Sequence, residues 1–567
     1  MLKTDQRSGL LVVTSAILAY CLTPQFGFVF DDRKQVLENS TLAHLGSIPG
    51  YFTHPGGYLV GDFSYYRPLF GAWTNLNYFA FGLHPAGWHV TLLLLHTCVA
   101  FLCFRMLLAL LGDLAAATIG ALLFAIHPIH VESVAWISGA TDPLAAAFLL
   151  LAFLIYLKAR ENRTLIFFSW LLFAASLLCK ETALVFPFVV LSYMLLLGDE
   201  KQRKIRSAII EIGPYFLIAG IYTAVRIHVL GGFSHTLTPL PFKVVLLTLP
   251  SVMVFYLRLL LFPLGLSPFY DTPYVKTASL AGFFTPLLIL LIIGGVLAVW
   301  VRRLKNTEDA KAPRQAGFFV AWMILLLVPA FNLTALDMGE IAHDRYLYLP
   351  SIGLCALVAL LAKEAGERLK VSPAFRNFAV AALAIILCTA TVAQSVFWKD
   401  DMSLYKRGAS MAPNNMGAQN NLANVYLDRG DFEHGIAIQQ RILQFDPSFV
   451  NSYFNLGVAY YKLGDQSRAK SYLQKAISMR PTPDSYFYLG LAEFKKGELA
   501  AAEESLRIAT QWSGQRADFH AVLGVLYETE GKLPLALQEL EMALSLNQGN
   551  QNVRNEIEKI KARLGQT

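Results

Sequence analysis

The chain has 567 residues, of which 55% are hydrophobic and 15% charged, and its mean hydropathy is +0.46. Soluble domains carry about a quarter charged residues, so this composition excludes a wholly soluble protein. The formal net charge of +7 does not indicate nucleic-acid binding. The excess cations lie mainly in short loops between apolar runs, where such residues set membrane topology. The six cysteines all fall in or beside apolar runs and predict neither a disulfide framework nor a zinc site.

Apolar runs follow one another along most of the chain. A membrane-spanning helix needs about 20 apolar residues. Lys3 and Arg7 precede the first run as in a signal peptide, but no cleavage site follows, so we expect an uncleaved span. The charge deficit ends near residue 398, which predicts a membrane domain over 1–398 and a soluble domain over 399–567. The expected spans are 10–28, 88–111, 114–128, 142–157, 164–179, 182–198, 207–225, 281–301, 316–332, 346–362 and 376–397.

Cationic loops orient these spans. The loops at 158–163, 201–206, 302–314 and 363–376 are rich in Lys and Arg, so they should face the cytoplasm. Alternation then puts the polar tail on the periplasmic or lumenal side. The apolar stretch 246–263 conflicts with this order, because a crossing there would move Arg302 and Arg303 outside. We therefore expect that stretch to be re-entrant or interfacial, with a break at Phe262-Pro263, and about eleven crossings in all.

The tail repeats itself after residue 413. Ala423, Gly457, Gly490 and Gly524 recur at intervals of 34, 33 and 34 residues, and a glycine follows each one seven residues later. This period is that of the tetratricopeptide repeat, a helix–turn–helix unit. We expect about four repeats, starting near 416, 450, 483 and 517. Stacked repeats form a concave groove for an extended polypeptide, although a rigid spacer that binds nothing is the alternative.

Two polar motifs lie between the first two expected spans. Asp31 and Asp32 follow the first span directly, and an acidic pair at the membrane surface could activate a hydroxyl as general base. The alternative is a charge pair that only ends the span. Tyr66 and Arg67 belong to a loop rich in aromatic and hydrogen-bonding residues, which suits a sugar or an interfacial aromatic belt. Arg67 could pair with a phosphate through its planar guanidinium.

Between later spans, His127, His130 and Glu132 form a compact polar knot. His130 and Glu132 could ligate a metal together with Asp32, but histidines suit magnesium or manganese poorly. We therefore predict no metal, and expect these residues to position the acceptor or to form a structural hydrogen-bonded knot.

Two further motifs carry cations. Lys180 and Glu181 interrupt an apolar stretch, where neither charge would stay unpaired. They could pair with other charges in the bundle, or Lys180 could face a lipid phosphate. Arg345 is the best candidate for a phosphate contact, with His343 close by. The alternative for Arg345 is a side chain that snorkels to water from a helix start.

Taken in order, these motifs resemble one family. They are Asp31-Asp32, the run 66–69, the run 123–132, Lys180-Glu181 and the run 345–351, followed by the repeats. The chain resembles the transmembrane and tetratricopeptide repeat-containing protein O-mannosyltransferases and their bacterial relatives. The resemblance implies an all-α, C-type glycosyltransferase bundle and a polyprenyl- or dolichyl-phosphate sugar donor. It also implies transfer to Ser or Thr on the lumenal or periplasmic side, usually with inversion, with Asp31 or Asp32 as catalytic base.

We therefore predict a membrane glycosyltransferase that transfers mannose or another hexose from the prenyl-phosphate donor to proteins bound by the repeats. The predicted location is a bacterial inner membrane, or the endoplasmic reticulum membrane in a eukaryote, with membrane lipid but no nucleic acid or cofactor as partner. The alternatives are transfer to an envelope glycan or lipid, and a non-catalytic scaffold. The predicted phosphate-binding residues are Arg345, Lys180, Arg67 and His343, and the predicted acceptor- or sugar-positioning residues are Tyr66, His127, His130, Glu132 and Glu181.

Overall fold

The computed structural model describes residues 3–54, 65–159, 163–200, 205–232, 240–304, 311–333 and 341–565. Parts of the cationic loops at 158–163, 201–206 and 302–314 lie outside these residues. The chain divides into two compact units, Met1–Ala412 and Pro413–Thr567. Every element in the described ranges is a helix, which confirms the all-α prediction. The first unit continues past the predicted boundary at 398, because helix α15 (Asp401–Met411) belongs to it.

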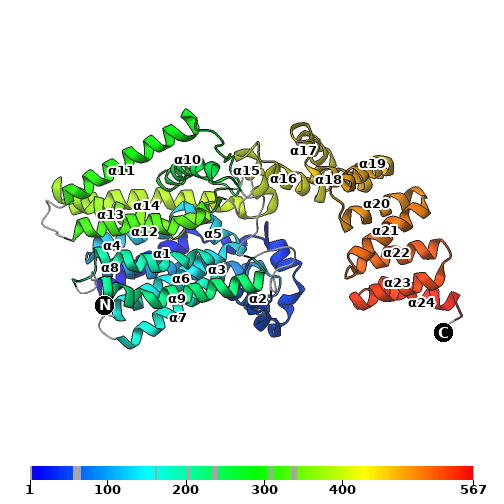
Figure 1. Ribbon diagram of the computed structural model, residues 1–567, viewed down its shortest axis with the longest axis horizontal. Helices are drawn as coiled ribbons and strands as arrows, with labels where there is room; N and C mark the ends of the chain where they lie inside the picture. The colour runs from blue at the N-terminus through cyan, green and yellow to red at the C-terminus, as the bar shows by residue number, and fades with distance from the viewer. Residues whose placement is uncertain are drawn as a thin grey trace. The chain divides into compact units, whose positions relative to one another are not determined.

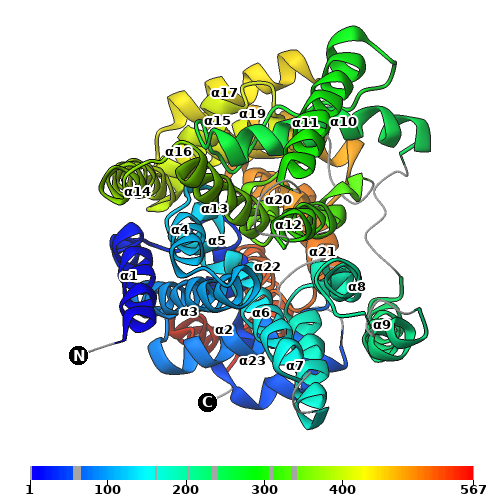
Figure 2. The same cartoon turned by 90° about the vertical axis from the view of Figure 1, so that its left-hand side faces the viewer.

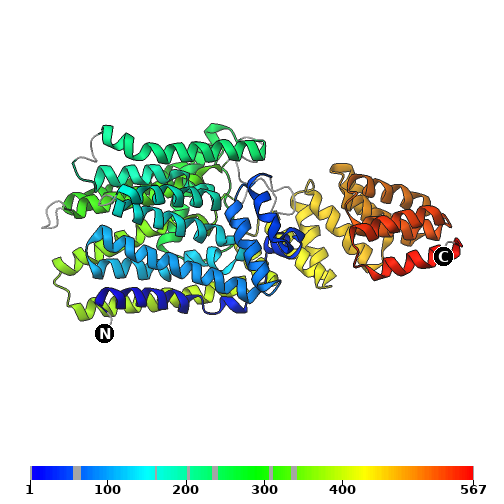
Figure 3. The same ribbon diagram turned by 90° about the horizontal axis from the view of Figure 1, so that it is seen from below.

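Long apolar helices form the first unit and run alongside one another (Figures 1 and 3). Neighbours in the chain pack as pairs, α3 on α4, α6 on α7 and α12 on α13, and α13 also packs on α4. Their shared core is rich in aromatic side chains such as Phe153 and Trp322, both fully buried. The helices are α1 (Thr4–Ala19), α3 (Pro85–Leu111), α4 (Leu114–Ala125), α6 (Thr141–Ala159), α7 (Ile166–Cys179), α8 (Phe186–Leu196), α9 (Ile205–Leu230), α11 (Thr285–Leu304), α12 (Ala312–Leu327), α13 (Pro350–Arg368) and α14 (Pro373–Ser395).

The protein is an integral, multi-pass membrane protein. In the described ranges, eight helices are long and apolar enough to cross a membrane, or nine if one bent pair counts as a span. The sequence predicts about eleven. The difference arises because the expected spans at 164–179 and 182–198 form only short apolar helices. The expected span at 346–362 begins as α13 at Pro350, and α13 ends in a charged turn that contains Lys363 and Glu364.

Helix α10 (Phe242–Leu261) covers the stretch that the sequence predicts to be re-entrant or interfacial. It is one helix of 20 residues and is apolar enough to cross a membrane. The expected break at Phe262-Pro263 falls just beyond its end, not within it. In Figure 1 α10 is foreshortened, whereas Figure 2 shows it from the side, so it runs across the direction of the long helices. Its interfacial position therefore stays a prediction.

Short elements at one end of the first unit carry the polar motifs. The bent pair is α4 followed by η5 (Pro128–His130) and α5 (Val131–Ala135), with a bend of 46°. Pro128 causes the break, because proline lacks an N–H donor and disfavours helical backbone in the residue before it. Figure 1 shows α2 (Pro68–Phe81), α5 and α15 at the end of the unit opposite to the N-terminus. The other short elements at issue are η2 (Arg33–Leu37), η6 (Ile137–Ala140), η8 (Glu181–Val185), η10 (Val328–Phe331), η12 (Asp344–Leu347) and η13 (Val396–Trp398).

The second unit is an array of paired helices. Small residues at the repeat positions let the two helices of a pair approach closely. A Cβ added to Gly457 would lie 2.5 Å from Leu473 Cγ, and one added to Gly490 would lie 2.6 Å from Leu506 Cγ. The helices are α16 (Met416–Asp428), α17 (Phe432–Phe445), α18 (Val450–Leu463), α19 (Gln466–Met479), α20 (Pro483–Lys496), α21 (Leu499–Trp512), α22 (Ala517–Thr529), α23 (Leu533–Leu546) and α24 (Gln551–Arg563).

Candidate active site

The loop after α1 holds its two acids in different surroundings. Asp32 is fully buried. Its Oδ1 accepts hydrogen bonds from the Ser138 N–H at 2.9 Å and the Ser138 hydroxyl at 2.5 Å, and its Oδ2 accepts from the Val29 N–H at 3.1 Å. Asp32 therefore ties the loop to η6. Asp31 is only half-buried.

The residue before the pair, Phe30, has a φ of 57°. This left-handed conformation is rare for a bulky residue and costs about 1–2 kcal/mol. The turn that presents Asp31 is therefore strained, and surrounding contacts must enforce it.

Burial dominates the ionisation of both acids. It raises the pKa of Asp32 to about 7, although the hydrogen bonds from Ser138 and Val29 favour the charged form. Burial also raises the pKa of Asp31, and the positive charges of Arg345 and Lys34 partly offset that rise. Asp31 is thus the less buried of the two acids, and the charge of Arg345 influences its pKa. This makes Asp31, rather than Asp32, the better candidate for a base that must reach a substrate.

Arg345 is held by a buried acid. Glu132 is 2% exposed, and its Oε2 accepts the Arg345 main-chain N–H at 3.0 Å. Its Oε1 pairs with Nη1 of the Arg345 guanidinium. The guanidinium carbon also lies 5.5 Å from the Trp136 ring and 5.4 Å from the Tyr346 ring, within reach of a cation–π interaction. Glu132 therefore fixes this cation in place and does not itself face an open site.

Lys180 is the second buried cation. Its Nζ donates to Asp142 Oδ1 at 2.7 Å and to Oδ2 at 2.6 Å, and its side chain is 3% exposed. The ammonium lies 5.5 Å from the Tyr346 ring, so Lys180 and Arg345 are both near the same tyrosine. Asp142 is not among the residues predicted from sequence. A signal was available, since an acid in the first turn of a helix followed by proline, as at Thr141-Asp142-Pro143, is typical of a helix start.

Arg67 and Glu181 form a third ion pair. The Arg67 Nε and Nη2 donate to the two oxygens of Glu181 at 3.0 and 2.7 Å, and Arg226 Nη1 lies 3.6 Å from Glu181 Oε2. Arg67 also stacks on Tyr65, with its guanidinium carbon 4.4 Å from the ring centroid. Glu181 thus neutralises the cation that the sequence suggests for a phosphate.

Three predicted positioning residues take part in internal hydrogen bonds. The Tyr66 hydroxyl donates to the Phe52 carbonyl at 3.2 Å. His127 Nε2 lies 3.1 Å from the Leu260 carbonyl oxygen, and His130 Nε2 lies 2.8 Å from the Ser351 hydroxyl. All three side chains are buried. Both histidines therefore match the structural knot that the sequence leaves open as an alternative.

His343 is 6% exposed, and its ring lies 5.6 Å from that of Tyr346. His343 and Arg345 thus both lie against the Tyr346 ring, and a phosphate-binding role for His343 stays a prediction. Among the described residues, no group of three or more His, Cys, Asp or Glu side chains could hold a metal ion.

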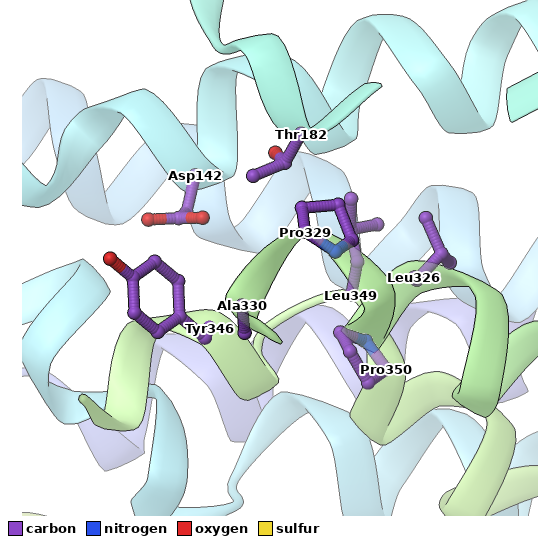
Figure 4. A pocket seen from close by; sticks show the side chains of 8 residues that line it. All are labelled: Asp142, Thr182, Leu326, Pro329, Ala330, Tyr346, Leu349 and Pro350. Carbon is purple, nitrogen blue, oxygen red and sulfur yellow. The ribbon is translucent and has the colours of Figure 1, made fainter. Parts of the chain in front are cut away.

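A small pocket that is partly open to its surroundings lies near the two cations, because Asp142, the partner of Lys180, and Tyr346, which lies near both cations, line it. Figure 4 shows Asp142 and Tyr346 facing each other on one side, with Thr182 above them, and Leu326 and Pro350 on the opposite side. Pro329, Ala330 and Leu349 complete the lining. The pocket therefore has a polar end near Lys180 and an apolar end formed by α12, η10 and the start of α13. The chemistry of this lining matches an amphipathic ligand that combines a polar group with a hydrocarbon chain.

The fold and this site define a multi-pass membrane protein with a tetratricopeptide tail and a rim of paired acids and cations. A family model described as a tetratricopeptide repeat matches residues 450–483. The chain is homologous to protein O-mannosyl-transferases of the TMTC group. It is 26% identical to Tmtc3 of Drosophila melanogaster, over 83% of this chain and 58% of the relative. It is 25% identical to human TMTC4, over 74% of this chain and 64% of the relative.

The chain spans between 53% and 64% of the length of the curated relatives that it matches. Two similar solved structures match only part of the chain. MamA is 25% identical, covers 26% of this chain and 85% of its own, and gives a TM-score of 0.25. A thermophilic TPR protein of Thermus thermophilus is 21% identical, covers 32% and 95%, and gives a TM-score of 0.26.

Proposed function

We propose that the protein is a membrane glycosyltransferase that transfers mannose or another hexose from a polyprenyl-phosphate donor to Ser or Thr hydroxyls of proteins. The observation that carries the proposal is that the loop of Asp31 and the cation of Arg345 meet at one aromatic ring. The Phe30 ring centroid lies 5.4 Å from that of Trp136, and the Arg345 guanidinium carbon lies 5.5 Å from the same Trp136 ring. An acid and a cation in this relation match the two needs of glycosyl transfer from a phosphate. Homology to proteins named O-mannosyl-transferases supports the same reaction class.

Asp31 acts as general base in this mechanism. It removes the proton from the acceptor hydroxyl as that oxygen attacks the anomeric carbon of the donor sugar. The bond between that carbon and the phosphate oxygen breaks, and its electron pair leaves with the polyprenyl phosphate. The proton on Asp31 then passes to water. Because attack and departure take place on opposite faces of the sugar, the configuration at the anomeric carbon inverts.

Arg345 and Lys180 offset the negative charge that develops on the leaving phosphate. Each is already paired with a buried acid, Glu132 or Asp142, so each is fixed before the donor binds. Fixed donors need no reorganisation during the reaction, and this raises their effect in a site that excludes water. The prenyl chain lies along the apolar wall that includes Leu326 and Leu349. Arg67 and His343 are assigned no direct contact with the phosphate in this mechanism. Arg67 donates hydrogen bonds to Glu181 at 3.0 and 2.7 Å.

The repeats bind the acceptor polypeptide and raise its local concentration near the membrane. This assignment requires the repeats and Asp31 to be on the same side of the membrane, the periplasm of a bacterium or the lumen of the endoplasmic reticulum. The positive-inside rule, applied to the cationic stretches of the sequence, supports that orientation.

Purified full-length protein incubated with synthetic prenyl-phosphate mannose and a Ser/Thr peptide tests the proposal. Mass spectrometry should detect a peptide that carries one added hexose. Replacing Asp31→Asn should lower the rate by about 10²–10⁴-fold, the usual contribution of a general base. Asp113→Asn is the matched control, because Asp113 caps α4 and an amide oxygen can still accept the Ala116 N–H. Full activity of Asp31→Asn would overturn the base assignment.

The same assay separates the competing functions. If hexose appears on extracted envelope glycan or lipid and on no peptide, the acceptor class is wrong while the donor chemistry stands. If no acceptor is labelled under any condition and partner proteins bind only the repeats, the chain is a scaffold. In that case Asp31→Asn would leave every measured property unchanged.

A further inference from the structure

The chain segment after the last membrane helix packs against the loop that carries Asp31. Asp401, the first residue of α15, lies 371 residues from Phe30 in sequence. Its Oδ1 accepts the Phe30 N–H at 3.1 Å. Its Oδ2 accepts the Arg33 Nε–H at 2.7 Å and lies 2.5 Å from Arg33 Nη2. Asp401 is buried, whereas the Arg33 side chain is half exposed, so these bonds are only partly shielded from water. One carboxylate therefore fastens the loop on both sides of the Asp31-Asp32 pair.

The bond to Phe30 falls at the strained residue. The φ of Phe30 is 57°, and a bulky side chain keeps this conformation only where its surroundings enforce it. The ring of Phe30 is held as well, since its centroid lies 5.4 Å from that of Trp136, 5.8 Å from Phe269 and 6.3 Å from Tyr405. Tyr405 belongs to α15. Helix α15 thus contacts both the backbone and the ring of the residue that precedes Asp31.

One contact just before α15 joins the same two segments, and a second joins Trp398 to the Trp136 ring on which Phe30 packs. The Gly27 N–H donates to the Lys399 carbonyl at 3.0 Å. The rings of Trp136 and Trp398 stack with centroids 6.0 Å apart. The loop is therefore bound along its length by residues 398–405, and release of one bond should not unfold the whole region.

We propose that Asp401 is a positioning residue for Asp31. By holding Phe30 in its left-handed conformation, Asp401 directs the Asp31 carboxylate toward Arg345. The catalytic consequence rests on the proposed function, but the brace itself does not. Helix α15 is also the last helix before the second unit begins at Pro413, so the segment that leads into the repeats fixes the proposed base.

Three variants of the full-length chain test this. Asp401→Ala removes the acceptor for the Phe30 N–H. Asp401→Asn keeps an acceptor oxygen but loses the charge that pairs with Arg33. Asp400→Ala is the matched control. Asp400 caps the same helix by accepting the Ser403 N–H at 2.8 Å, and this bond lies within α15.

Hydrogen–deuterium exchange provides a readout that needs no activity. Amides of residues 27–37 should exchange faster in Asp401→Ala than in wild type, and at the wild-type rate in Asp400→Ala. In the transfer assay, Asp401→Ala should lower kcat by at least about tenfold, because a misplaced catalytic group is costly even at small displacements. The donor KM should change by less than about twofold, since donor contacts remain. Asp401→Asn should retain more activity than Asp401→Ala.

Unchanged exchange at 27–37 in Asp401→Ala would overturn the proposal, and so would an equal increase in Asp400→Ala. Faster exchange with unchanged kcat would also overturn it, because the brace would then position no catalytic group. If the wild-type chain transfers no sugar to any acceptor, the proposed function fails. The exchange data still decide in that case whether Asp401 braces the loop.

Discussion

Glu132 binds Arg345 through two different groups of the arginine. One carboxylate oxygen accepts the Arg345 main-chain N–H at 3.0 Å, and the other pairs with the guanidinium. The first contact fixes the backbone of η12 against α5, and the second fixes the direction of the side chain. The orientation of the cation is therefore set by a residue 213 positions away in sequence.

This arrangement predicts different effects of two substitutions at Glu132. Glu132→Ala leaves a largely buried guanidinium without its partner, which should cost about 3–5 kcal/mol of stability. Glu132→Gln should cost less, because its amide oxygen can still accept the Arg345 N–H. Thermal unfolding in detergent measures both. Glu364→Gln, near the C-terminal end of α13, is a control for the loss of a carboxylate away from Arg345. Equal unfolding temperatures for the two Glu132 variants would contradict the double role.

The buried pair of Lys180 and Asp142 allows a structural role to be separated from phosphate binding. Lys180→Met or Asp142→Leu alone leaves an unpaired buried charge and should destabilise the protein by about 3–5 kcal/mol. The double variant removes both charges, so its stability should return close to that of wild type. Its activity should not return, because the donor phosphate loses a cation. If the double variant regained full transfer activity, Lys180 would not belong to the donor site.

The charge of Lys34 should influence the pH dependence of the reaction. Burial raises the pKa of Asp31, and Arg345 and Lys34 lower it. Lys34→Gln removes one lowering influence, so the pKa of Asp31 should rise. A general base must be ionised, and the acidic limb of the kcat/KM profile should therefore move to higher pH while the maximal rate stays close to wild type. Lys158→Gln, at the far end of α6, should leave the limb in place. A shift to lower pH would exclude Asp31 as the titrating base.

The repeats and the polar motifs could be predicted from sequence for different physical reasons. The repeat signal is local and periodic, because Gly457 packs on Leu473 within one helix pair. The motif residues could be identified because charges next to lipid are costly and are rarely kept without a use. The residues that pair with these motif residues in the fold could not be predicted from the sequence. Asp142 is 38 residues from Lys180, and only the packing of α6 beside α7 brings the two together.

The expected domain boundary shows a related limit of the sequence. Helix α15 is polar enough to read as the start of the soluble tail, yet Asp401 and Tyr405 are buried against the loop after α1. Composition reports how polar a segment is, but not which segment covers it. In the described residues fewer helices than the eleven predicted spans are long and apolar enough to cross a membrane for a similar reason, since apolar runs such as 164–179 are short helices in the fold.

Asp32 should make the stability of the folded protein depend on pH. Its pKa rises from an ordinary value of 3.8 to about 7 in the folded protein, so the folded state binds the proton more tightly than the unfolded state. The stabilisation that the proton on Asp32 gives the folded state is complete below pH 3.8 and is lost as the pH rises toward 7. An amide cannot titrate, so the unfolding temperature of wild type should fall relative to that of Asp32→Asn across this window. The two curves should run parallel above it.

Asp31→Asn measures the contribution of the neighbouring acid to the same trend, because burial also raises the pKa of Asp31, and Arg345 and Lys34 offset that rise only in part. The hydrogen bonds from Ser138 and Val29 oppose the predicted trend at Asp32, since they favour the carboxylate. A wild-type curve that rises relative to Asp32→Asn over this range would mean that these bonds outweigh burial. Asp32 would then be ionised throughout, and the loop would be held by a charged anchor in place of a neutral one.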